Sequence, residues 1–243
     1  MRDFLTPVTV TDPRPGPDQP DELRYLRAYL LMRAFIGGLA ISLPFALVLF
    51  DEFLFSKKPN YARDSLSSYF YSGSRDLFVG GLSATAVFLI TYKVVERNLD
   101  NTLSIVAGAG AMLVALFSTG RPSRTFALTP LQDRLGETFV QAIHYAAAGV
   151  FIASLGFICV TFGIREGKRP RRSKQHRSPM FWKTYHLACA GIIGFAGIFI
   201  IICGAIGRPK NSLLIGEVMS VWAFGASWLM KGLELEVLRK PKV

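Results

Sequence analysis

Polar residues inside apolar segments are costly in lipid, so they are the residues best placed to do chemistry in this sequence. Glu137, Gln141 and His144 lie at positions i, i+4 and i+7, which places them on one face of a helix. Arg75 and Asp76 begin one apolar segment, and Glu217 lies near the start of another. Carboxylate, imidazole and guanidinium groups together can bind a cation, move a proton or hold an anion. The candidate binding site therefore consists of Arg75, Asp76, Gln141, His144 and Glu217.

The composition predicts that an integral membrane protein positions these residues. Of the 243 residues, 51% are hydrophobic and only 19% are charged, and the mean hydropathy is +0.33, whereas soluble domains carry about 25% charged residues. Six apolar segments are each long enough to cross a hydrocarbon core of ~30 Å at ~1.5 Å per residue. The predicted fold is an all-α bundle of six transmembrane helices, at 29–50, 76–94, 102–119, 138–164, 183–206 and 213–230.

The chain divides into three predicted parts. Residues 1–20 form a proline-rich cytoplasmic arm with five of the 13 prolines. Residues 21–232 form the six-helix transmembrane domain, and residues 233–243 form a short basic tail. Asp3 and the prolines of the arm are unlike a cleavable signal peptide, so the first transmembrane helix is expected to direct insertion.

The basic residues predict the orientation of the bundle. Eighteen Lys and Arg residues flank one side of the predicted helices and nine flank the other. Because basic residues accumulate on the cytoplasmic side, both termini are predicted to be cytoplasmic. The loop REGKRPRRSKQHR dominates the count, and binding of anionic lipid head groups is an alternative role for this loop.

This orientation places the polar candidates at similar depths. His144 is expected about 9 Å, and Glu217 about 6 Å, below the outer surface, and Asp76 lies at that surface. These residues are expected to line one outer-leaflet cavity, with Arg75, Arg121 and Arg208 around its mouth. Three interpretations stay open: a structural cluster that joins helix ends, a binding pocket, and a catalytic site. On α-helical spacing, Glu217, Ser220, Ser227 and Lys231 also share one face.

Several other functions are excluded. Cys159, Cys189 and Cys203 all lie in apolar segments and form no CxxC pair, which argues against a disulfide framework or a zinc ribbon. The net charge of +11 comes from residues at the ends of apolar segments, which does not favour nucleic-acid binding. His144 and His186 are expected about 20 Å apart in depth, too far to share a haem or a metal. No catalytic residue or metal ligand is assigned, and the sequence identifies no cofactor.

Small and aromatic residues predict how the helices pack. The small residues are expected to allow close contacts between helices, with a ligand groove or an oligomer interface as the alternative; they are Ala107, Gly108, Ala109, Gly110, Ala111, Gly191, Gly194, Ala196 and Gly197. The aromatic residues are expected to form belts at the membrane surfaces; they are Trp182, Trp222, Trp228, Phe53, Phe55, Tyr61, Tyr69, Phe70 and Tyr71.

Four segments resemble a family of bacterial six-helix membrane proteins of unknown function. They are SLSSYFYSGSRDLFVGGL (65–82), AGAGAMLVALFSTGRP (107–122), IHYAAAGVFIASLGF (143–157) and GEVMSVWAFGASWLMKG (216–232). The resemblance implies a six-helix bundle in the bacterial inner membrane and supplies no activity. It points to Ser65, Ser67, Tyr69, Tyr71, Arg75, Asp76, His144, Glu217 and Trp228. A weaker similarity to alkaline ceramidases and adiponectin-type receptors lacks their HxxxH pair and seventh helix, which argues against a zinc hydrolase.

The sequence favours a non-catalytic membrane protein. We expect an accessory or interaction subunit that contacts membrane lipids and a partner protein or pigment complex, because no complete catalytic set lies at one depth. The alternative is a small membrane enzyme or lipid-binding receptor whose outer-leaflet pocket contains Asp76, His144 and Glu217. A transporter is a third hypothesis, which the lack of charged residues near the middle of the bilayer argues against.

Overall fold

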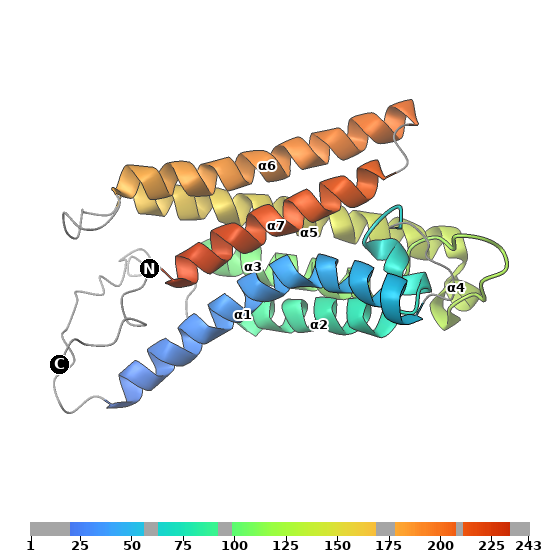
Figure 1. Ribbon diagram of the computed structural model, residues 1–243, viewed down its shortest axis with the longest axis horizontal. Helices are drawn as coiled ribbons and strands as arrows, with labels where there is room; N and C mark the ends of the chain where they lie inside the picture. The colour runs from blue at the N-terminus through green and yellow to red at the C-terminus, as the bar shows by residue number, and fades with distance from the viewer. Residues whose placement is uncertain (1–19, 56–62, 92–98, 169–177, 208–210, 234–243) are drawn as a thin grey trace, which may run out of the picture.

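The computed structural model describes residues 20–55, 63–91, 99–168, 178–207 and 211–233 (Figure 1). Residues 1–19 of the predicted arm, most of the basic loop, and the tail beyond residue 233 lie outside the described residues. Within them the fold is all helical, as predicted, with seven α-helices: α1 (Pro20–Phe50), α2 (Arg75–Thr91), α3 (Leu99–Leu116), α4 (Pro130–Leu135), α5 (Glu137–Gly167), α6 (Pro179–Ile206) and α7 (Ser212–Leu233). A π-helical turn (Asp51–Phe55) and a 3₁₀ turn (Ser67–Tyr71) complete the helical elements.

Five of these helices are long and apolar enough to cross a membrane: α1, α3, α5, α6 and α7. This agrees with a multi-pass membrane protein. α2 has 17 described residues, or about 26 Å at ~1.5 Å per residue, somewhat less than a hydrocarbon core of ~30 Å. Its predicted continuation to residue 94 falls outside the described residues, so the sixth transmembrane helix stays a prediction.

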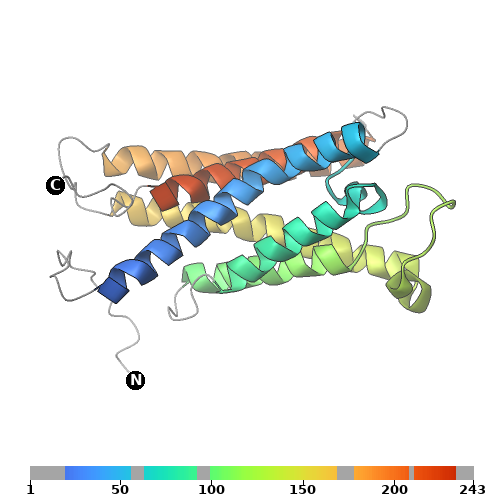
Figure 2. The same ribbon diagram turned by 60° about the horizontal axis from the view of Figure 1, so that its bottom comes forward.

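The six long helices form a closed ring. Each packs against the next in chain order, α7 packs back against α1, and α5 also contacts α7. α4 and the turns after α1 lie together at one end, which we call the α4 end (Figures 1 and 2). At the opposite end, which we call the distal end, α1 begins and α7 ends.

Small residues allow the closest of these helix contacts. A Cβ atom on Gly37 of α1 would lie 2.8 Å from the backbone nitrogen of Leu229 on α7, and a Cβ on Gly225 would lie 3.0 Å from the Gly37 carbonyl oxygen. Gly108 of α3 lies equally close to α2, where its Cβ would be 2.7 Å from the Ala86 carbonyl oxygen. Because burial in lipid gives helices little hydrophobic drive to associate, such close backbone contacts stabilise the ring through van der Waals packing.

Aromatic side chains fill the interior of the ring. Trp228 is fully buried, with Phe162 and Phe224 at ring-centroid distances of 5.4 and 5.1 Å. Tyr69 and Phe70 are buried as well. The predicted aromatic belt is therefore wrong for Trp228, Tyr69 and Phe70, because these rings pack between helices instead of facing the membrane surface.

Local signals set several helix ends. The Ser178 hydroxyl accepts a hydrogen bond from Phe181 N, and Pro179 follows it at the first position of α6. α6 ends at Gly207, whose φ of 67° is a left-handed conformation that glycine adopts at low cost. Gly136, with φ of 88°, separates α4 from α5. The turn at Gly136 lets α5 begin directly after α4 and return into the bundle.

Candidate functional site

A groove of about 680 Å³ runs along α5 and α6 toward the α4 end. On α5 its wall extends from His144 to Val160, about 24 Å of helix at ~1.5 Å per residue. α5 and α6 separate toward this end (Figure 1). Small-molecule sites typically have volumes of roughly 300–1,000 Å³, so the groove is large enough to hold a ligand.

Glycines without packing partners form part of the groove wall. A Cβ atom added to Gly149, Gly194 or Gly197 would meet nothing within 4 Å. The expectation that the glycines of α6 support close helix contacts is thus wrong for Gly194 and Gly197, and also for Gly191, which has the same open surroundings outside the groove. Among the described residues, no atom of another helix comes within 4 Å of a Cβ added at these three positions of α6. Because glycine has no side chain, Gly194 and Gly197 leave room in the groove.

Among the described residues that line the groove, the polar ones all lie toward the α4 end. Apart from the exposed Tyr145, its polar residues are all buried: Ser65, Ser67, Thr119, His144 and Glu217. The rest of its wall is glycine and apolar side chains, including Phe157, Ile198 and Ile201. These three apolar side chains are exposed, so the groove opens on an apolar face of the bundle.

His144 joins the start of α5 to the end of α3. Its Nδ1 lies 2.6 Å from the carbonyl oxygen of Phe117, and the Val114 carbonyl also faces the ring. Carbonyls in the last turn of a helix lack partners within that helix, so this contact satisfies a group that would otherwise be buried without one. Since a carbonyl oxygen only accepts, Nδ1 carries the proton, and a neutral ring then presents Nε2 as an acceptor.

Glu217 joins α7 to the 3₁₀ turn. Its Oε2 accepts a hydrogen bond of 2.6 Å from the backbone nitrogen of Leu66, and nearby Leu214 N donates to the Asp64 carbonyl at 3.0 Å. Among the described residues, Oε1 of Glu217 has no hydrogen-bond partner. Ser67, which is 7% exposed, likewise has no described partner for its hydroxyl. Both residues line the groove and a smaller cavity of about 70 Å³ beside it.

The structure brings two of the five predicted site residues into the groove, His144 and Glu217. Arg75 and Asp76 are exposed at the start of α2, and the Arg75 guanidinium lies 4.4 Å from the centre of the Phe70 ring. Gln141 is half-buried and donates to the Tyr145 hydroxyl at 2.9 Å. α2 packs against α1 and α3, away from the groove, so the equal depth of these residues does not bring them together.

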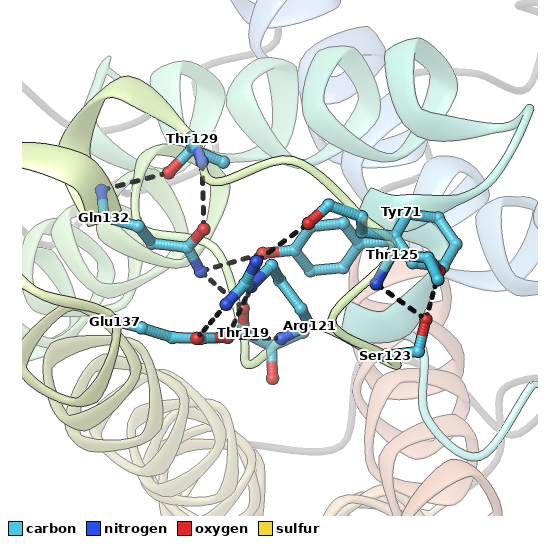
Figure 3. A network of polar contacts seen from close by, with 9 residues as sticks. Tyr71, Thr119, Arg121, Ser123, Thr125, Thr129, Gln132 and Glu137 are labelled. Atoms are coloured by element: carbon cyan, nitrogen blue, oxygen red, sulfur yellow. Dashed lines mark hydrogen bonds and ion pairs between the residues drawn. The ribbon is translucent and has the colours of Figure 1, made fainter.

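A network of polar contacts closes the α4 end of the bundle (Figure 3). Arg121 makes two hydrogen bonds to the Glu137 carboxylate, Nε to Oε1 at 3.1 Å and Nη2 to Oε2 at 2.8 Å, and a third from its backbone nitrogen at 3.0 Å. The bond to Glu137 raises the pKa of Arg121. Arg121 therefore holds the loop to α5 and does not line the groove, and Arg208 lies outside the described residues.

A buried amide forms the centre of this network. Thr129 and Gln132 form a capping box at the start of α4, with each side chain bonded to the backbone nitrogen of the other residue. The Gln132 amide also donates to the Tyr71 hydroxyl at 2.8 Å, and Tyr71 donates to the Thr119 carbonyl at 2.9 Å. In the same 3₁₀ turn, burial raises the pKa of the Tyr69 phenol.

Sequence reasoning missed two ion pairs toward the distal end, in which every charged residue but Arg165 is buried. Lys231 of α7 pairs with Glu166 of α5, and Arg165 of α5 pairs with Asp100 of α3. The Arg33 guanidinium lies 5.2 Å from the centre of the Phe162 ring. Arg33 was the available signal, because a charge inside an apolar segment is unusual. Glu166 instead resembled an ordinary charge flanking a membrane helix, and the sequence placed Lys231 on a polar face without indicating Glu166 as its partner.

The four residues that the spacing places on one face of 217–231 are all buried. Ser220 and Ser227 are fully buried, and Glu217 and Lys231 nearly so. Ser227 lies 2.8 Å from Nδ1 of His186 on α6. His186 and Ser227 join α6 to α7 toward the distal end, whereas His144 lies at the α4 end.

The described residues contain no group of three or more His, Cys, Asp or Glu side chains that could hold a metal ion, and the three cysteines are free and buried. The described helices and the groove thus define a multi-pass helical membrane protein with a groove that opens on an apolar face. Comparison with protein-family models, curated proteins and solved structures finds no match for the chain. The resemblance to a bacterial six-helix family therefore stays a prediction.

Proposed function

We propose that this chain is a multi-pass membrane protein that binds the apolar chain of a lipid-like molecule in the groove along α5 and α6. The observation that carries the proposal is the combination of a glycine-lined apolar wall with a buried polar end at His144 and Glu217. Ligand sites commonly have this composition, mostly apolar with a few polar groups that orient the ligand. The function corresponds to the lipid-binding alternative from the sequence, with Asp76 outside the groove.

The proposal includes a location for the site. We place the chain in the bacterial inner membrane with six transmembrane helices, α2 being the sixth, and with the distal end cytoplasmic. The two-fold excess of Lys and Arg on the distal side supports this orientation. The polar end of the groove then lies in the outer leaflet, where a lipid enters sideways from the bilayer.

The test uses glycines of α6 that differ only in their relation to the groove. Gly194→Leu and Gly197→Leu place a side chain in the groove without a clash, because their surroundings are open. Gly191→Leu is the matched control, since Gly191 is equally open and does not line the groove. Each variant is purified in mild detergent, and the molecules that co-purify are extracted and identified by mass spectrometry.

We expect a stoichiometric amphiphile with the wild-type chain and with Gly191→Leu, and its loss from Gly194→Leu and Gly197→Leu. Thermal unfolding of each variant checks that the helices remain folded. If all four proteins carry the same lipids in the same amounts, the lipids coat the outer surface and the proposal is wrong.

A second candidate function, the accessory subunit, is favoured by the surface around α4. Phe126, Leu128, Leu131 and Leu135 are exposed there, outside the helices able to cross a membrane, with exposed fractions between 36% and 48%. Such a patch suits contact with a partner protein. The test of the subunit function is purification from native membranes of the wild-type chain and of the variants Leu131→Ser and Leu135→Ser. A larger assembly that the serine variants disrupt would support the subunit function, and a chain that runs alone would contradict it.

A further inference from the structure

The polar end of the groove indicates which head group it accepts. Resting on the proposed function, we infer that the ligand is a single-chain amphiphile whose head group donates hydrogen bonds and carries no negative charge. A long-chain alcohol and a long-chain amine share this chemistry, and the experiment below distinguishes them.

His144 contributes an acceptor. Its Nδ1 is committed to the Phe117 carbonyl at 2.6 Å, so this nitrogen is the donor of the neutral ring. The polar group that remains for a ligand is the lone pair of Nε2. Only a head group with an O–H or N–H can bond to it.

Glu217 and Ser67 contribute further oxygen atoms. One carboxylate oxygen of Glu217 is occupied by Leu66 N, while Oε1 and the Ser67 hydroxyl have no partner among the described residues. Glu217 is 9% and Ser67 is 7% exposed, so water covers little of either side chain. Neither oxygen is among the fully enclosed polar atoms that lack a partner, so both oxygens reach the open space of the groove. A donating head group supplies the hydrogen bond that each oxygen lacks within the described residues.

The described part of the groove offers no positive charge to an anionic head group. Neither lysine nor arginine is among its described lining residues. Two arginines that the sequence predicted at the mouth of the cavity are engaged elsewhere. Arg121 pairs with Glu137, and Arg75 lies above the Phe70 ring. A phosphate or carboxylate would therefore lie beside the Glu217 side chain without a counter-ion, and burial of an unpaired charge is unfavourable.

The shape of the groove accommodates one apolar chain. It follows two neighbouring helices over about 24 Å of α5, close to the thickness of a hydrocarbon core. Its wall away from the polar end consists of small and aliphatic residues such as Gly156, Ile193 and Ile201. One extended hydrocarbon chain fills such a groove, and the head group of the ligand then lies at His144 and Glu217.

The experiment measures binding of four probes with the same chain to the full-length protein in detergent by native mass spectrometry: hexadecylamine, hexadecanol, hexadecanoate and hexadecyl phosphate. We expect the amine and the alcohol to bind at least about tenfold more tightly than the two anions. A tenfold difference in affinity is what the loss of one charge-assisted hydrogen bond produces. The ammonium of hexadecylamine supplies the counter-ion that a Glu217 carboxylate lacks among the described lining residues. Glu217→Gln keeps the acceptor for Leu66 N but cannot form a carboxylate, so it is expected to weaken the amine about tenfold and to leave the alcohol nearly unchanged.

Two further variants make the result specific. His144→Asn can still donate to the Phe117 carbonyl but lacks the Nε2 acceptor, and it is expected to weaken both donating probes. Asp76→Asn is the control, because this exposed carboxylate lies at the same end outside the groove. Thermal unfolding shows which variants are folded before binding is compared.

The outcomes separate the two proposals. Equal or tighter binding of hexadecanoate or hexadecyl phosphate, still blocked by Gly194→Leu, would overturn the head-group inference and leave the proposed function standing. If no probe binds, or if Gly194→Leu blocks none of them, the groove is not a chain-binding site and both proposals fail.

Discussion

Gln132 and Tyr71, 61 residues apart in the sequence, are joined by a hydrogen bond of 2.8 Å from the amide nitrogen to the phenol oxygen. Gln132 is 1% exposed and also caps its own helix, α4. The 3₁₀ turn, the end of α3 and the loop before α5 thus meet at a single buried amide. The same 3₁₀ turn supplies Ser67 and the Leu66 nitrogen at the groove, so we expect this contact to hold one wall of the site.

Gln132→Ala is expected to lower the free energy of unfolding by about 1–3 kcal/mol, because it leaves Thr129 N without its acceptor and removes the donor to the Tyr71 oxygen, which keeps only its bond to the Thr119 carbonyl. Chemical unfolding in detergent micelles measures the change. Gln141→Ala is the matched control, since this amide is only half-buried and bonds the exposed Tyr145. Combination with Tyr71→Phe should be less than additive, as for residues in one network. Full additivity, or equal effects of Gln132→Ala and Gln141→Ala, would contradict the central role of Gln132.

Gly37 and Gly38 are adjacent on α1 and should respond in opposite ways to alanine. At Gly37 the new Cβ would lie 2.8 Å from Leu229 N, a backbone atom that cannot move independently, so we expect a loss of about 1–3 kcal/mol from overpacking. At Gly38 the new Cβ meets nothing within 4 Å, and alanine should stabilise the helix by up to about 1 kcal/mol. Thermal unfolding of the two variants decides this, and equal melting temperatures would show that α1 does not pack closely on α7.

The sequence predicted the helices better than the site. The segment 138–164 corresponds to α5 (Glu137–Gly167), and 102–119 corresponds to α3 (Leu99–Leu116), with a shift of three residues. This agreement has a physical reason: a helix satisfies its own backbone in lipid, so apolar length alone indicates it. α4 was not predicted, because its six residues depend on a local capping box and on tertiary contacts of Gln132.

The candidate site required information that hydropathy does not contain. The sequence placed Asp76, His144 and Glu217 at similar depths, but depth says nothing about the order of helices around the ring. α2 packs against α1 and α3, so Asp76 lies away from the groove that contains His144 and Glu217. The contact from Leu66 N to Glu217 joins residues 151 positions apart and depends on how the loop after α1 returns to α7.

The Arg121–Glu137 ion pair should contribute to stability in a salt-dependent way. Both side chains are partly exposed, and the pair is bidentate, so we expect Glu137→Gln to lower the melting temperature modestly at low salt. The difference from wild type should shrink at high salt because salt screens exposed charges. Asp133→Asn on α4 is the control, since Asp133 is an exposed carboxylate without a described ion pair. A salt-independent loss would mean that the shape of the carboxylate matters more than its charge.

The buried pair Lys231–Glu166 should be the most sensitive to removal of one partner. Both side chains are at least nine-tenths buried, and they join α7 to α5 toward the distal end. Lys231→Met leaves the carboxylate in a buried position without this cation, so we expect a loss of about 3–5 kcal/mol, whereas Lys231→Met combined with Glu166→Gln should cost clearly less than the sum of the single changes. Lys168→Met is the matched control, because this exposed lysine directly follows α5 and its replacement should change stability by no more than about 0.5 kcal/mol. Chemical unfolding in mixed micelles of five proteins gives the comparison: wild type, Lys231→Met, Glu166→Gln, the double variant and Lys168→Met. Equal small effects of Lys231→Met and Lys168→Met would show that the pair does not hold α5 and α7 together.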